Sequence, residues 1–133
     1  MNRYFDIALN LANERFSGER DKVIADAFTR NVNYFNIVCS SLNELDFVKD
    51  LNDKYRKNSC FTLGVHPHNA NELNGNTLNS LKNSIKIHQP SAVGETGLDF
   101  FRNLSSYENQ INAFEQQIII SIENNLHLFL HQR

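Results

Sequence analysis

The strongest constraint on the fold of this sequence is its regular alternation of strand-like and helix-like segments. Alternating or β-branched apolar residues predict strands over 4–10, 34–39, 60–65, 92–96 and 126–133. Helical spacing predicts four helices between them, at about 23–28, 41–57, 77–88 and 105–124. Such alternation forms right-handed βαβ units and a parallel sheet. We therefore expect an α/β fold with about five parallel strands, either a doubly wound open sheet or part of a (β/α)8 TIM-type barrel.

Local motifs refine this expectation. Ser41 with Glu44, and Ser105 with Glu108, have the spacing of capping boxes and predict helix starts. Residues 66–76 are rich in Asn and contain helix breakers, which predicts a loop. The sequence has no Gly-x-Gly-x-x-Gly and no P-loop, so the nucleotide-binding open sheets lose support.

Composition limits the class of partner. The net charge of −2 argues against a basic surface that grips duplex nucleic acid. Cys39 and Cys60 are too far apart for a Cys-x-x-Cys site, so we expect small buried apolar groups in a reducing compartment. We find neither a signal-like segment nor an apolar run of membrane-spanning length, and we expect a cytoplasmic protein without membrane contact.

Four of the expected strands end in polar side chains that can bind metal. In parallel α/β folds the working groups gather beyond the carboxyl ends of the strands. The candidates are Asp6 and Asn10 on the first strand, His66 and His68 after the third, Glu95 on the fourth and His131 on the fifth.

Most of these candidates also have a purely structural explanation. Asp6 and Asn10 can cap or turn the chain, and His66 and His68 can form a surface turn. His131 can be a hydrogen-bonded core residue. We expect His88 and His127, which have no other candidate beside them, to be structural or exposed. Glu95 is the exception, because burying a carboxylate in a small apolar segment is costly unless it is paired or bound to metal. Together, imidazoles and carboxylates on one rim are ligands for Zn²⁺ or Mn²⁺ and predict a metal-assisted hydrolase.

At these residues the sequence resembles the TatD family of metal-dependent deoxyribonucleases. The matching segments are 5–11, 64–68, 94–100 and 131–133, in the order found in the N-terminal half of that family. The resemblance implies an amidohydrolase-like barrel of which residues 1–133 are the N-terminal part. It also implies a divalent metal ion (Mg, Mn or Zn) as cofactor and DNA as the substrate of a 3′–5′ exonuclease.

The resemblance implies roles for individual residues as well. Glu95 matches the catalytic, metal-bridging glutamate, and His131 matches a metal-binding histidine. His66, His68 and Arg102 are implied to contact the phosphate of the substrate.

On the first strand the sequence departs from the family. Many members carry a His-x-His pair where this chain has Ala8 and Asn10. Asp6 and Asn10 therefore remain as weak contributors, and Asp99 is expected to support the site from the loop after the fourth strand.

The second departure is length. A complete barrel needs eight strands and about 250 residues, whereas this chain has 133. A further histidine and an aspartate that the family uses as ligands would lie on later strands. We expect a piece of a longer barrel. The alternatives are a half-barrel that a second chain completes, an inactive remnant, and an amidohydrolase-like enzyme for another small substrate.

Overall fold

The computed structural model describes residues 3–133, which form one parallel sheet of five strands. The strands lie in chain order, β1-β2-β3-β4-β5, and each is parallel to its neighbour. In a doubly wound sheet the strand order reverses partway, whereas in a TIM barrel consecutive strands stay adjacent. The topology therefore confirms the partial TIM-type barrel and excludes the doubly wound alternative.

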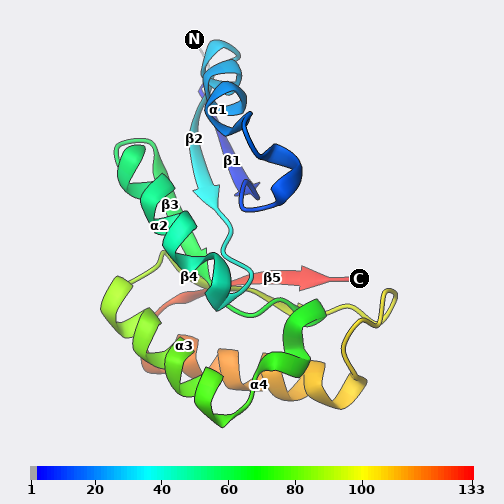
Figure 1. The fold of residues 1–133 in the computed structure, drawn as a ribbon. Helices are drawn as coiled ribbons and strands as arrows, with labels where there is room; N and C mark the ends of the chain where they lie inside the picture. The colour runs from blue at the N-terminus through cyan, green and yellow to red at the C-terminus, as the bar shows by residue number, and fades with distance from the viewer. Residues whose placement is uncertain (1–2) are drawn as a thin grey trace.

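The five predicted strands and four predicted helices are all present, with shifts of a few residues at their ends. The strands are β1 (Tyr4–Leu9), β2 (Val32–Ile37), β3 (Ser59–Leu63), β4 (Ala92–Leu98) and β5 (His127–Gln132). The α-helices are α1 (Arg20–Thr29), α2 (Leu45–Lys54), α3 (Gly75–His88) and α4 (Tyr107–Glu123). Three short 3₁₀ helices are η1 (Glu14–Phe16), η2 (Leu42–Glu44) and η3 (Pro67–Glu72). Figure 1 shows α1 beside β1 and β2, α2 beside β3, and α3 and α4 below β4 and β5.

The apolar core lies between the sheet and the helices. Ile37, Leu63 and Val93, from β2, β3 and β4, are fully buried, and Ile120 of α4 packs in the same core. The helices contribute to the same core, with Leu81 of α3 among the fully buried residues. This core fixes the strands whose ends carry the polar candidates.

The first predicted capping box is wrong. Ser41 is the N-cap of the 3₁₀ turn that precedes α2, and its side chain makes no capping hydrogen bond. Glu44 instead accepts a hydrogen bond from the backbone N–H of Ser40 (2.8 Å). The helix also ends at Lys54, earlier than predicted.

The second predicted capping box is also wrong. The N-cap of α4 is Ser106, whose hydroxyl accepts the N–H of Asn109 (3.2 Å). Ser105 is buried, and its hydroxyl donates to the carbonyl of His68 (2.8 Å). Ser105 thus ties the start of α4 to the loop that carries two candidate histidines.

The predicted loop over 66–76 contains more regular structure than expected. Pro67 begins η3, since its fixed φ suits the first position of a helix. Asn74 and Thr77 then form the capping box that starts α3, with the Asn74 side chain accepting the Thr77 N–H (3.3 Å) and the Thr77 hydroxyl accepting the Asn74 N–H (2.7 Å). Asn74, one of the asparagines that led us to predict a loop, is the N-cap of α3.

Both cysteines are free, with Cys39 buried and Cys60 half-buried. Burial raises the pKa of the Cys39 thiol to about 12, and the nearby Glu44 carboxylate adds to the increase. Among the helices of residues 3–133, none is both long and apolar enough to cross a membrane.

Candidate active site

Glu95 is placed by an irregularity in β4. Gly94 pairs with Phe129 of β5 and Thr96 pairs with the next residue, Leu130, so Glu95 is an extra residue in the ladder. Such a bulge redirects a side chain. β4 continues beyond Glu95 to Leu98, so the carboxylate lies within the strand and not at its end as predicted.

Two glycines on either side of Glu95 allow β5 to approach this bulge. Gly94 and Gly97 have φ values of +145° and +140°, which L-amino acids with side chains rarely adopt. A Cβ atom at either position would also collide with a backbone carbonyl oxygen of β5, at Phe129 or His131. The local backbone therefore requires glycine at positions 94 and 97.

His66 and His68 come from the loop between β3 and η3. His66 is the N-cap of η3, and its Nδ1 accepts the backbone N–H of His68 (3.1 Å). An accepting Nδ1 is unprotonated, so in the neutral ring Nε2 carries the hydrogen. The cap thereby fixes the ring of His66 and leaves Nε2 free to face the sheet.

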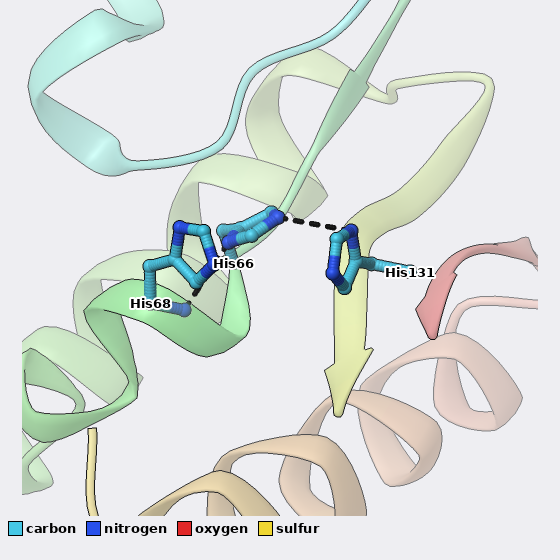
Figure 2. Close-up of side chains that lie close together, drawn as sticks. All are labelled: His66, His68 and His131. Carbon is cyan, nitrogen blue, oxygen red and sulfur yellow. Dashed lines mark hydrogen bonds between the residues drawn. The ribbon is translucent and has the colours of Figure 1, made fainter. Parts of the chain in front are cut away.

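Three imidazoles converge at the rim of the sheet. Figure 2 shows His66 and His68, from the loop after β3, facing His131 of β5. His66 Nε2 lies 3.2 Å from His131 Nδ1. One nitrogen from each of the three rings falls within 4.8 Å of the others. The structure thus brings together residues separated by more than sixty positions in the chain.

Two carboxylates complete this group, and each touches two histidines. Glu95 Oε1 is 2.9 Å from His131 Nδ1 and 3.6 Å from His66 Nε2. Asp99 Oδ2 is 2.6 Å from His68 Nε2 and 3.2 Å from His131 Nε2. His131 therefore has a carboxylate at each ring nitrogen.

The surroundings keep both carboxylates ionised. His66 lowers the pKa of Glu95 most and His131 adds to the effect, while partial burial opposes them. The backbone N–H of Arg102 donates to Asp99 Oδ1 (2.8 Å) and holds the pKa of that carboxyl far below its usual range, with further lowering by His68 and His131. The Asp99 side chain is only 1% exposed, so these partners replace solvent.

The donor set fits a divalent metal ion. Two nitrogens bound to one tetrahedral ion at about 2.0–2.1 Å lie roughly 3.3 Å apart, close to the 3.2 Å between His66 Nε2 and His131 Nδ1. Metal binding at His66 Nε2 would require that nitrogen to give up the hydrogen it carries in this arrangement. Imidazole with carboxylate suits Zn²⁺ or Mn²⁺ better than Mg²⁺, which prefers oxygen ligands.

The other predicted site residues lie outside the cluster. Asn10 lines the same open cleft as His66, His68 and Glu95, with a volume of about 290 Å³. Asp6 is exposed, and its carboxylate accepts the N–H of Ala8 (3.0 Å).

Arg102 reaches Asp99 only through its backbone, and its side chain is exposed. His127 is exposed as expected, and His88 is half-buried at the end of α3. Neither of these two histidines contributes a nitrogen to the cluster within the described part of the chain.

Two buried glutamines that sequence reasoning missed hold the site loops. The Gln117 amide accepts the Val65 N–H (2.8 Å) and donates to the Val65 carbonyl (3.0 Å). The Gln110 amide accepts the Asp99 N–H (2.8 Å) and donates to the Ser105 carbonyl (2.9 Å). Both lie on the face of α4 that also carries Ala113 and Ile120. Their helical spacing relative to these apolar residues is the feature of the sequence that could have predicted their burial.

A curled parallel half-barrel whose histidines and carboxylates gather at one rim belongs to the class of TIM-type folds. Comparison with known proteins specifies the family. The sequence model of the family described as TatD related DNase matches residues 5–133. The chain therefore belongs to the TatD family.

Named relatives agree with this assignment. The protein named 3′-5′ ssDNA/RNA exonuclease TatD from Pantoea ananatis is 36% identical over 129 residues, which cover 97% of this chain and 50% of the relative. The protein of the same name from Escherichia coli is 37% identical over 130 residues, covering 97% and 49%. The chain spans about half the length of the curated relatives it matches.

Solved structures show the same fold. YJJV, a TatD homologue from Escherichia coli K12, superposes with a TM-score of 0.89 at 23% identity, over 98% of this chain and 51% of that one. A TatD family hydrolase from Entamoeba histolytica gives a TM-score of 0.87 at 26% identity, over 99% and 50%.

Proposed function

We propose that this chain supplies the N-terminal half of a metal-dependent hydrolase that cleaves phosphodiester bonds of single-stranded DNA from the 3′ end, with RNA as a second substrate. The observation that carries the proposal is the contact of three imidazoles with two carboxylates at one rim. The names of the relatives support the substrate class and the direction of cleavage. Because the chain spans half of those relatives, the activity of the whole protein is part of the proposal.

The geometry favours a wider ligand set than the family resemblance implied. His131 and Glu95 keep their expected roles, and His66 and His68 become ligands in addition to phosphate contacts. A divalent ion in this site supplies Lewis acidity toward a phosphoryl oxygen and lowers the pKa of water. The imidazole-rich set favours Zn²⁺ or Mn²⁺.

The remaining roles follow from contacts within the chain. Glu95 is a carboxylate at neutral pH, because its lowered pKa keeps it ionised, and in that form it can accept a proton from an attacking water. Asp99 orients the rings of His68 and His131 through its hydrogen bonds. The exposed guanidinium of Arg102, in the loop after Asp99, is available to a phosphate.

A nuclease assay with a matched control tests the proposal. We expect the purified chain to shorten a 5′-labelled single-stranded DNA only when Mn²⁺, Zn²⁺ or Mg²⁺ is added. His131→Ala should reduce the rate by about 100-fold or more, whereas His127→Ala, an exposed histidine on the same strand, should leave it unchanged. Equal rates for the two variants would overturn the assigned ligand.

Metal binding is measured on the same samples by calorimetry. Metal-dependent hydrolysis of small esters or amides without cleavage of DNA would favour the amidohydrolase-like alternative. Binding of metal without any hydrolysis would favour the view that this half-barrel needs further barrel strands.

We also propose that the sheet edges are covered in the working protein, by more of the same polypeptide or by a second chain. Among the described strands, β1 pairs only with β2 and β5 only with β4. Apolar side chains are exposed at both edges, with Ile7 63% and Leu130 58% exposed. Open edges with apolar side chains invite pairing. Sedimentation of the 133-residue chain separates these cases, since a stable monomer contradicts pairing of two identical half-barrels.

A further inference from the structure

The loop that joins β4 to α4 exposes several large apolar side chains beside the candidate site. Phe100 directly follows Asp99, and it is 42% exposed. Phe101 and Leu104 of this loop are 74% and 59% exposed, and Tyr107, the first residue of α4, is 61% exposed. We call these four residues the aromatic loop. Apolar groups gathered on a surface mark a binding site more often than scattered ones do.

The rings of this loop are held in place by one another and by an arginine. Phe100 and Tyr107 stack with their centroids 4.6 Å apart and their planes at 23°. The guanidinium of Arg133 lies 4.6 Å from the centroid of the Phe101 ring. Because Phe101 is 74% exposed, the ring face away from Arg133 is open. The loop therefore presents fixed, accessible aromatic surface.

Arg133 connects the aromatic loop to the histidine cluster. Its N–H donates to the carbonyl of Leu98 (3.0 Å), and its carbonyl accepts the N–H of Phe100 (3.1 Å). Arg133 thus continues the pairing of β5 beyond Gln132. Figure 1 shows the loop, in yellow, beside the end of β5.

The distance from the cluster to the loop matches the scale of a nucleic-acid strand. Phe101 follows Asp99 by two residues, so their Cα atoms are at most about 7 Å apart. That upper limit corresponds to about two base steps of 3.4 Å. A strand with one phosphate at the cluster can therefore place a neighbouring base on the loop.

The local charge suits the same ligand. Arg102 and Arg133 place two guanidinium groups in or against the loop, although the chain as a whole has a net charge of −2. Aromatic rings interleaved with cations bind single-stranded nucleic acid, because bases stack on the rings and cations neutralise phosphates.

We propose that the aromatic loop is a stacking site for an unpaired nucleobase next to the cleavage site. The identity of the ligand rests on the proposed function. Every base has a stacking face, so this site binds with little sequence preference but requires a base that is free of its pairing partner. It therefore selects single-stranded ends over duplex.

The experiment measures binding without cleavage. A short single-stranded DNA with 2-aminopurine at its 3′ end is titrated with the full chain in EDTA, and stacking is read as quenching of the 2-aminopurine fluorescence. We expect Phe101→Ala to weaken binding by about fivefold or more and to remove most of the quenching. Phe101→Trp should restore both. Ile122→Ala, which changes a 73% exposed residue on α4, is the matched control and should bind like the parent chain.

An oligonucleotide with an abasic 3′ position completes the test. The parent chain should bind it as weakly as Phe101→Ala binds the intact oligonucleotide, and Phe101→Ala should show no further loss. A matched RNA reports whether the base can come from either nucleic acid. The proposal is overturned if the parent chain does not quench the probe, or if Phe101→Ala changes stability or assembly but not binding.

Failure here is separate from failure of the proposed function. Quenching in EDTA without any metal-dependent cleavage supports the stacking site and contradicts hydrolase activity of the half-barrel on its own. Metal-dependent cleavage together with unchanged binding by Phe101→Ala supports the hydrolase and contradicts the stacking site.

Discussion

Strands β1 and β4 belong to one sheet but differ sharply in their surroundings. Nearly every residue of β1 is exposed, whereas most of β4 is buried. β4 lies between β3 and β5 and is covered by α4, while β1 has only β2 beside it among the described strands. α1, the helix that follows β1, buries a single residue, Ile24.

This difference explains where the candidate site forms. A carboxylate can be held at a fixed position only when the backbone on both sides is restrained, as at Glu95 between β3 and β5. Asp6 on β1 has no such support, and its carboxylate bonds only to its own strand. The polar groups of β3, β4 and β5 therefore converge, whereas β1 brings only Asn10 to the cleft.

The largest expected effect tests the contrast in packing. Ile120 of α4 and Ile24 of α1 are both buried, at 0% and 2% exposure. We expect Ile120→Ala to lower the free energy of unfolding by about 3–5 kcal/mol and Ile24→Ala by about 2–3 kcal/mol, because the looser surroundings of Ile24 can collapse around the missing atoms. Urea unfolding of both variants measures the difference. If the two variants lost equal free energies of unfolding, or if Ile24→Ala lost more, the two ends of the sheet would not differ in packing as described.

A somewhat smaller effect is expected from the buried amides. Gln117→Leu leaves the N–H and carbonyl of Val65 without their side-chain partner. We expect a loss of about 2–4 kcal/mol in the free energy of unfolding. The control, Gln116→Leu, changes a half-buried residue on the same helix and should cost less than about 0.5 kcal/mol. If both variants unfold at the same urea concentration, α4 does not hold the loop after β3.

The smallest effect concerns the link between α1 and α2. Lys54 Nζ lies 2.6 Å from Asp21 Oδ1, but the two side chains are 52% and 71% exposed. Lys54 lowers the pKa of Asp21, so any stabilisation is present above the unfolded-state value of about 3.9 and is lost as the pH falls. Exposed pairs contribute little, and we expect Asp21→Asn to leave the urea midpoint unchanged at pH 7. A clear shift would mean that the β1 end depends on surface charge.

The order of elements could be predicted from the sequence because apolar periodicity records which faces are buried. Leu81 and Ile85 of α3 show this agreement, as both are buried where the pattern places them. Helix starts were harder to predict, since Ser41 has the right spacing but its side chain makes no capping hydrogen bond, and the N-cap of α4 is Ser106 and not Ser105. Only the tertiary structure shows that Ser105 bonds to the carbonyl of His68.

The candidate site was partly predictable for the same reason. The rule that parallel strands end at one rim brought Glu95, His131, His66 and His68 into one group, and the structure places them in contact. Asp99 was expected only in support, because its distance from His68 depends on how the loop after β4 folds. That metal binds there remains a prediction.

Gln110 and Gln117 are seven residues apart, two turns and about 10 Å along α4. Because α4 is a single helix, it sets the spacing between the loop of His66 and the loop of Asp99. A one-residue deletion between these glutamines would swing one amide by about 100° around the helix axis and release one loop while the other stayed attached. The length of this helical segment therefore fixes how far apart the two loops are held at Val65 and Asp99.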